Sequence, residues 1–277
     1  MQLNNESKTL FIPLLGKAQM SRKNLFISDK KAEEIIQKVD FDFQKLKQSE
    51  ALSMYMAARA AIFDDICNEF IFNHPNAVIV HLGCGLDARC LRVNKNYEKW
   101  YDVDFKSVIS LRKNFYEESD NYKMIGSPIA ELRWHEINRP NANVLVVAEG
   151  LTMYLSETEL RETLQNIRKA FGCVEILFDA YSTRAVKLSR RKNPVNQVNA
   201  TVKWGMDTSD DFLKLNSDLV FIKEYPIRRE EKRLKGIKKF IFNHLYCGKF
   251  SQSLYKIYRF QFNKNRKEQI NYDYDQS

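Results

Sequence analysis

The chain has 277 residues with a formal net charge of +9, and 44% of its residues are apolar. This length fits one large α/β domain or two small ones, with enough apolar residues for a substantial core. No stretch approaches the roughly 18 uninterrupted apolar residues of a membrane span, and residues 1–17 lack the basic-then-apolar order of a signal peptide. The five cysteines are scattered without a C-x-x-C pair, which predicts a reduced, cytoplasmic protein with neither a disulfide framework nor a zinc site.

The N-terminal part of the chain is expected to form a helical cover ahead of the main fold. Residues 1–30 are polar and irregular in pattern, with Pro13 and Gly16 as breakers, which predicts a mobile cover or a disordered arm. A long helix is then expected over residues 49–72, with Ser49 as its N-cap.

Residues 77–92 read A-V-I-V-H-L-G-C-G-L-D-A-R-C-L-R, and the rest of the chain is organised around them. An apolar, β-branched run leads into a loop with Gly83 and Gly85, which predicts a buried strand, a tight turn and a helix start. A side chain at either glycine would hold a ligand away from the backbone. Together with Ala88 the two glycines satisfy the G-x-G-x-x-G/A dinucleotide pattern, although a lone match of this kind is weak.

A second short strand, residues 100–104, ends in carboxylates about twenty residues after the glycine loop. An acid at that spacing commonly holds a ribose hydroxyl, and Asp102 and Asp104 are the two candidates. The loop and the carboxylates together predict a cofactor-binding α/β enzyme.

Strand and helix patterns alternate through the following residues, which predicts a parallel sheet with helices on both faces. One expected helix, over residues 156–171, opens with a capping box formed by Ser156 and Glu159. The other expected elements are helices over 106–118 and 208–216 and strands over 122–125, 143–148, 174–178, 219–225 and 254–262.

No linker divides the chain, so a single domain over residues 1–277 is expected. The stretch 182–206 is basic and then loop-like around Pro194, and insertions of this length often cover a site. The expected parts are a helical cover (1–75), a cofactor-binding core (76–181), a lid or insertion (182–217) and C-terminal strands with a basic helix (218–262).

Four separated motifs resemble the leucine carboxyl methyltransferase family, which includes the bacterial polyketide-type O-methyltransferases. G-C-G-L-D-A-R (83–89) resembles the family's G-C-G-L-D-T-R loop, and Y-D-V-D-F (101–105) is similar to its second-strand motif. A-E-G-L-T-M-Y-L (148–155) resembles its fourth-strand motif, and Arg59 falls where the family has a cofactor-contacting arginine. The resemblance implies a doubly wound, mostly parallel, seven-stranded Rossmann-like sheet of a class I methyltransferase that uses S-adenosylmethionine.

The resemblance also implies roles for individual residues. The guanidinium of Arg59 would pair with the carboxylate of the cofactor, unless this mid-helix arginine faces solvent. For the ribose hydroxyls the family pattern favours Asp104 over Asp102, while Ser127 stands where relatives often have an aspartate–leucine pair at the adenine. The residues expected to bind the cofactor are Arg59, Gly83, Gly85, Asp104, Ser127 and Glu149.

For Glu149, at the end of the fourth strand, the alternative is a carboxylate that serves the helix start near Ser156. Tyr154 and Arg184 are the candidate substrate contacts, and core packing is an equal alternative for Tyr154. No catalytic residue is assigned, and no metal site is expected.

The expected reaction transfers a methyl group to a carboxylate or hydroxyl oxygen of a small, anionic substrate. A carboxylate is already ionised at neutral pH, whereas a phenol would benefit from a general base. None of the four histidines lies in a recognisable acid–base constellation, which favours a carboxylate. The alternatives are an NAD(P)-dependent oxidoreductase and a basic nucleic-acid-binding module that uses residues 232–239. The nucleic-acid alternative is disfavoured, because these lysines are also typical of the solvent face of an amphipathic helix. No membrane partner is expected, and the oligomeric state is left open.

Overall fold

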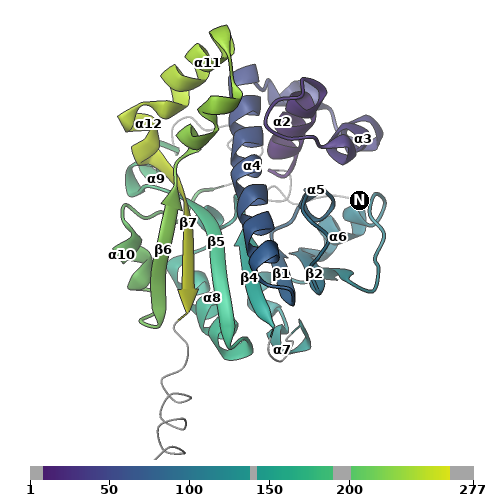
Figure 1. The fold of residues 1–277 in the computed structure, drawn as a ribbon, viewed down its shortest axis with the longest axis vertical. Helices are drawn as coiled ribbons and strands as arrows, with labels where there is room; N and C mark the ends of the chain where they lie inside the picture. The colour runs from purple at the N-terminus through teal and green to yellow at the C-terminus, as the bar shows by residue number, and fades with distance from the viewer. Residues whose placement is uncertain (1–8, 138–141, 190–200, 263–277) are drawn as a thin grey trace, which may run out of the picture.

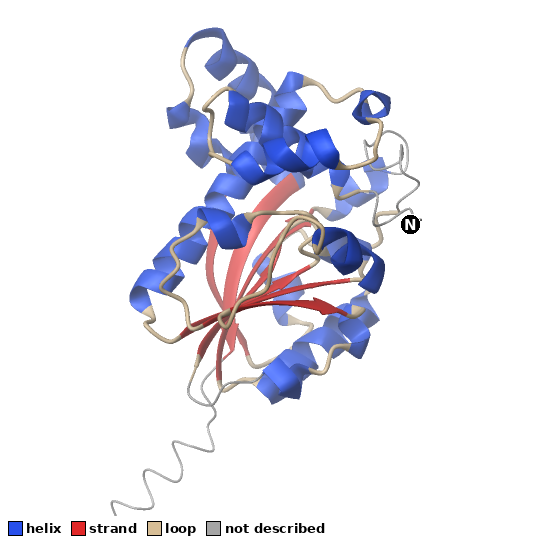
Figure 2. Ribbon diagram, turned by 90° about the vertical axis from the view of Figure 1, so that its right-hand side faces the viewer, coloured by secondary structure: helices blue, strands red, loops and turns tan. Residues whose placement is uncertain are grey.

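The computed structural model describes residues 9–137, 142–189 and 201–262. They contain a seven-stranded sheet with the order β3-β2-β1-β4-β5-β7-β6. Strand β7 is antiparallel to both of its neighbours, while the other described strand pairs are parallel. Helices cover both faces of the sheet (Figure 1 and Figure 2). The predicted doubly wound, mostly parallel fold with an N-terminal helical cover is therefore confirmed.

All of the predicted strands are present, with small shifts at their ends. Their bounds are β1 (Ala77–Leu82), β2 (Lys99–Asp104), β3 (Tyr122–Gly126), β4 (Asn143–Ala148), β5 (Cys173–Tyr181), β6 (Leu219–Tyr225) and β7 (Tyr255–Phe262). The described helices are α2 (Phe11–Arg22), α3 (Lys30–Lys38), η1 (Phe43–Leu46), α4 (Glu50–Asn73), α5 (Arg89–Arg92), α6 (Lys106–Arg112), η2 (Ile129–Glu131), α7 (Trp134–Ile137), η3 (Thr152–Tyr154), α8 (Glu157–Ala170), α9 (Thr183–Ser189), α10 (Ser209–Leu213), η5 (Ile227–Arg233), α11 (Gly236–Phe242), η6 (Asn243–Cys247) and α12 (Lys249–Leu254).

The core has two layers because successive side chains of a strand point to opposite faces of the sheet. Ile79 of β1 belongs to the layer that includes the apolar residues of α2 and α4. Val80 belongs to the other layer, with the inner face of α8. Strand β1 is buried along its whole length, as expected for a central parallel strand covered on both sides.

The prediction of an irregular arm over residues 1–30 is wrong for the described part, because residues 11–22 form the buried helix α2. Pro13 lies in the first turn, where its missing N–H costs no helical hydrogen bond. Gly16 does not break the helix but allows α2 to approach α4 closely. A Cβ atom at Gly16 would lie only 2.8 Å from the Cβ atom of Met56.

The helix expected over residues 106–118 is too long, since α6 ends at Arg112. Beyond Arg112, side-chain hydrogen bonds to distant parts of the chain hold the backbone in a non-helical path. The buried Arg112 donates from Nη2 to Asp102 Oδ2 at 2.5 Å, and the hydroxyl of Tyr116 donates to the carbonyl of Leu86 at 2.9 Å.

The expected lid over 182–217 is described only in part, because residues 190–200 lie outside the described ranges. Residues 183–189 form α9, and the loop expected around Pro194 lies outside the described residues. After the gap, the N–H of Lys203 donates to the carbonyl of Met153 at 2.7 Å, and the N–H of Met206 donates to the carbonyl of Tyr181 at 2.8 Å. A closing motion of this segment stays a prediction, as does the division of the chain into four parts.

Candidate active site

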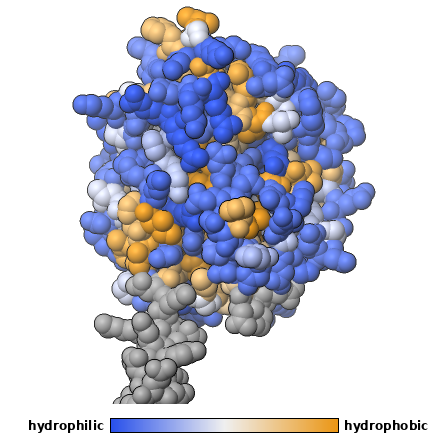
Figure 3. Space-filling model, viewed as in Figure 1, coloured by the Kyte–Doolittle hydropathy of each residue, from blue (hydrophilic) through white to orange (hydrophobic). Residues whose placement is uncertain are grey.

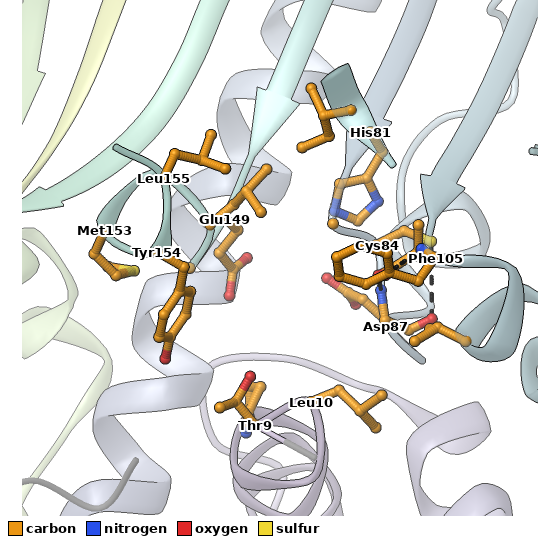
Figure 4. A pocket seen from close by; sticks show the side chains of 18 of the residues that line it. Thr9, Leu10, His81, Cys84, Asp87, Phe105, Glu149, Met153, Tyr154 and Leu155 are labelled. Carbon is orange, nitrogen blue, oxygen red and sulfur yellow. Dashed lines mark hydrogen bonds between the residues drawn. The ribbon is translucent and has the colours of Figure 1, made fainter. Parts of the chain in front are cut away.

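A cavity of about 260 Å³ lies where the carboxyl ends of β1, β2 and β4 meet the start of α2. The strand order reverses at β1, which has β2 on one side and β4 on the other. Open α/β sheets bind their ligands at this kind of switch point. In Figure 4, Glu149 and Tyr154 line one side of the cavity and His81 and Phe105 the other, while Leu10 faces the strand ends from the turn just before α2.

The glycine loop borders the cavity in a conformation that side chains rarely adopt. Gly83 has φ +62° and Gly85 has φ +52°, both in the left-handed region that favours glycine. A Cβ atom at Gly83 would lie 3.1 Å from Leu151, and one at Gly85 would lie 3.2 Å from Leu10. A side chain at either glycine would therefore occupy part of the space at the cavity wall that the backbone leaves open.

The structure distinguishes the two carboxylates at the end of β2. Asp104 lines the cavity, and its side chain accepts the N–H of Gly85 at 2.8 Å and the N–H of Phe105 at 2.7 Å. Burial raises the pKa of Asp104 above its ordinary value, although these two N–H groups oppose the shift. Asp102 is fully buried and is not among the cavity residues, so Asp104 is the carboxylate available to a ligand.

Asp102 instead fixes a histidine at the cavity wall. Its Oδ1 lies 3.1 Å from Nδ1 of His81, whose Nε2 faces Nη1 of Arg89 at 3.2 Å. Since Arg89 can only donate, Nε2 of His81 is the acceptor and Nδ1 carries the proton that is donated to Asp102. Both ring nitrogens are thus in use, so this histidine has a structural role in the cavity wall.

Arg59 is buried in the middle of α4 and reaches the cavity wall, so the solvent-facing alternative is wrong. Its Nη1 donates to Asp179 Oδ2 at 3.2 Å, and its Nε lies 2.9 Å from Glu149 Oε1. The geometry at Nε is not that of a hydrogen bond, so this buried donor has no hydrogen-bond partner among the described residues. Two carboxylates hold the guanidinium in place while part of its donor capacity is left over.

Asp179 at the end of β5 is the second anchor of Arg59. Its Oδ1 accepts the N–H of Gly150 at 2.7 Å, and its Oδ2 accepts the hydroxyl of Tyr255 at 2.5 Å. Burial raises the pKa of Asp179, which Arg59 opposes. Removal of the arginine would leave this carboxylate buried without a cation.

Glu149 lies between Arg59 and Arg89 at the end of β4. Burial alone would raise the pKa of its carboxyl group, but the two guanidinium groups outweigh burial and lower that pKa to about 2. The capping box of α8 is completed by Glu159 with Ser156, as predicted, so Glu149 does not serve that helix start.

The remaining predicted site residues differ in their positions. Ser127 and Tyr154 line the cavity, and burial raises the pKa of the Tyr154 phenol. Arg184 is not among the cavity residues and is exposed on α9, where its guanidinium lies 4.8 Å from the ring centroid of Phe250. Its expected contact with substrate finds no support in this geometry, because the guanidinium packs on Phe250 outside the cavity.

Several cavity residues were not anticipated from the sequence. Residues 9–17, in the turn before α2 and in the first half of that helix, contribute much of the wall. The apolar run Leu10–Leu15 is the signal that could have indicated a buried helix there. Lys203 reaches the cavity from the segment after the gap, and no local pattern marks it.

No three His, Cys, Asp or Glu side chains come together as a potential metal site within residues 9–137, 142–189 and 201–262. Across the same ranges, no helix combines the length and apolar character needed to cross a membrane.

Comparison with known proteins agrees with this site. The family model for leucine carboxyl methyltransferase matches residues 13–168. The tetracenomycin polyketide synthesis O-methyltransferase TcmP of Streptomyces glaucescens is 32% identical over 208 residues, which are 74% of this chain and 77% of TcmP. The S-adenosyl-L-methionine-dependent methyltransferase dpfgK of Gibberella zeae is 28% identical over 228 residues, which are 74% of this chain and 76% of dpfgK.

Solved structures share the fold at low sequence identity. A methyltransferase of Anabaena variabilis that depends on S-adenosylmethionine aligns with a TM-score of 0.51 at 12% identity, over 74% of this chain and 84% of its own. Magnesium protoporphyrin IX methyltransferase of Synechocystis, solved with bound S-adenosylhomocysteine, aligns with a TM-score of 0.50 at 7% identity, over 84% of this chain and 94% of its own.

The fold, the site and these relatives together define a methyltransferase that uses S-adenosylmethionine. The chain belongs to the leucine carboxyl methyltransferase family. The alternative of a nicotinamide-dependent oxidoreductase, which rested on Gly83, Gly85 and Ala88, is therefore wrong.

Proposed function

We propose that the enzyme methylates a carboxylate oxygen of a small, anionic acceptor. In this proposal the methionine part of the cofactor lies against Gly83 and Gly85, and its carboxylate meets Arg59. The ribose hydroxyls donate to Asp104, and the adenine lies toward Ser127. Two observations fit this placement. Within the described part of the chain the buried Nε of Arg59 has no hydrogen-bond partner, and a Cβ atom at either glycine would narrow the space for the cofactor.

The choice of acceptor rests on one observation, namely that every histidine and carboxylate among the described cavity residues already has a partner. Asp104 accepts two backbone N–H groups, and Glu159 accepts the N–H of Ser156 at 2.7 Å. Both nitrogens of His81 are bonded, and Glu149 has a pKa of about 2 between two arginines. Asp87 is paired with Lys17 at 3.0 Å and with Arg92 at 2.7 Å. Methyl transfer needs a nucleophile aligned with the methyl carbon, and a carboxylate arrives already ionised.

Lys203 supports an anionic acceptor. It is exposed at the cavity, and the described part of the chain gives its ammonium group no carboxylate partner within ion-pair distance. The two other cationic side chains at the cavity wall, Lys17 and Arg59, are both paired with carboxylates. Relatedness to TcmP, which is described as an O-methyltransferase, supports transfer to oxygen.

The bond that is formed can be tested directly. The enzyme is incubated with S-adenosylmethionine labelled in its methyl group and with aromatic carboxylic acids, each beside the phenol of matching shape. We expect label in products that release volatile methanol in mild base, because a methyl ester hydrolyses there and an ether does not. Base-stable label that accumulates on the phenols would contradict the proposal and would assign a hydroxyl acceptor instead.

A further inference from the structure

An exposed apolar face lies over α11 and the segment that follows it. Ile237 is 69% exposed and Phe240 is 68% exposed, and both point away from the body of the protein. The spacing puts them on one side of α11 together with Ile241, while Phe242 is fully buried on the other side. The same surface continues to Leu245 and Phe250, which are 43% and 52% exposed.

The residues on and beside this face are predominantly basic. Between residues 232 and 255 the chain has six Lys and Arg residues and no Asp or Glu. Nearby Arg233 is paired with Glu230 at 2.6 Å, whereas the described residues give the lysines no carboxylate partner within ion-pair distance. Those lysines are Lys232, Lys235, Lys238, Lys239 and Lys249. Figure 3 shows the apolar residues at the top of the molecule within a hydrophilic surround.

We propose that this basic, apolar face docks on an anionic lipid surface. Aliphatic and aromatic side chains that enter the boundary between headgroups and acyl chains, with flanking lysines that meet anionic headgroups, are the chemistry of interfacial helices. The face is about one helix long, so it predicts peripheral and reversible docking rather than insertion across the bilayer.

Two other occupants fit the face less well. Nucleic acid would pair with the lysines, but it offers nothing to the aliphatic side chains of Ile237, Ile241 and Leu245. A second copy of the chain in a two-fold contact would bring this face against itself, so that lysines would face lysines. An anionic lipid surface offers headgroups to the lysines and an acyl layer to the apolar side chains.

The face lies at the end of the molecule that carries the cavity. In Figure 1, α11 lies at the same end of the molecule as α2, which covers the cavity. Phe242 of α11 packs on Phe26 with ring centroids 5.7 Å apart, and Tyr246 packs on Tyr55 of α4 at 4.8 Å. Docking would therefore bring the cavity end of the protein toward the lipid.

The test is flotation of the full chain with vesicles of phosphatidylcholine alone or of an equal mixture with phosphatidylglycerol. We expect binding to the mixed vesicles that weakens with added salt and is absent from phosphatidylcholine alone. The double variant Ile237→Ser/Phe240→Ser should bind about tenfold more weakly or worse, because its apolar contact with the bilayer is lost. Lys235→Glu/Lys239→Glu should show a loss of about the same size.

Matched controls distinguish binding through this face from nonspecific binding by any exposed apolar or basic residue. Phe72→Ser changes a phenylalanine that is 83% exposed near the far end of α4. Lys113→Glu/Lys123→Glu makes the same change in net charge just after α6 and on β3, away from the face. Both controls should float like the wild type, and all variants should keep normal affinity for S-adenosylhomocysteine.

Three results would overturn the proposal. The first is wild-type protein that does not float with the mixed vesicles, and the second is face variants that float as well as the controls. The third is a dimer, or a complex with a labelled oligonucleotide, that Ile237→Ser/Phe240→Ser abolishes while flotation is unchanged. Each of these results leaves the assignment of the carboxylate acceptor untouched.

Discussion

Replacement of Gly85 by valine is expected to abolish cofactor binding while the protein still folds. The residue has φ +52°, which a β-branched side chain adopts at a cost of about 1–2 kcal/mol. Its Cβ atom would lie 3.2 Å from Leu10, on the wall of the cavity. If the turn moves to relieve this contact, the bond from the N–H of Gly85 to Asp104 is lost as well. Titration calorimetry with S-adenosylhomocysteine provides the measurement.

Gly172→Val is the matched control. The same substitution there meets no atom within 4 Å, and Gly172 is not among the described residues with positive φ. We expect this control to bind the cofactor like the wild type. Near-normal affinity in Gly85→Val would show that the loop is a structural turn without a ligand against it.

Loss of the Arg59 side chain is expected to weaken cofactor binding by about ten- to a hundredfold. Hydrogen bonds to charged groups contribute roughly 1.5–3 kcal/mol, and each factor of ten corresponds to about 1.4 kcal/mol. Arg59→Lys should recover only part of the affinity, because it keeps the charge and loses the planar fork. Dissociation constants of the wild type and both variants, Arg59→Ala and Arg59→Lys, are the measurement.

Arg59→Ala carries a complication that the structure makes clear. Asp179 would be left buried without its cation, and breaking a buried pair on one side typically costs about 3–5 kcal/mol of stability. Arg59→Met/Asp179→Asn removes both charges together, and the asparagine oxygen can still accept the N–H of Gly150. If this folded double variant binds S-adenosylhomocysteine as tightly as the wild type, Arg59 has no contact with the cofactor.

Features with local signals could be predicted from the sequence. The strand and turn at Gly83 and Gly85 depend on β-branched residues in the strand and on glycines that can adopt positive φ, and both residue types are visible in the sequence. The N-cap of α4 at Ser49 and the capping box of α8 are formed as expected, because each uses a side chain and a backbone N–H three residues apart.

Features that depend on tertiary contacts could not be predicted. Helix α2 is apolar around its circumference and contains Pro13 and Gly16, so its helical character depends on burial against α4. Arg59 was expected to contact a ligand, but its ion-pair partner Asp179 was not anticipated. Asp179 lies 120 residues further along the chain, and no sequence pattern links the two residues. Arg184 was expected at the site because it lies in the basic stretch that was interpreted as a lid, whereas on α9 its guanidinium packs on Phe250.

Thermal unfolding with and without S-adenosylhomocysteine or NAD tests the central claim most directly. That claim is that the cavity at Gly83, Gly85 and Arg59 binds S-adenosylmethionine. A ligand that binds only the folded state at about a hundredfold excess over its Kd adds about 2.7 kcal/mol, or about 5–10 °C for a domain of this size. We predict such a rise with S-adenosylhomocysteine, none with NAD, and none with either ligand in Gly85→Val. A rise with NAD and none with S-adenosylhomocysteine would contradict the account.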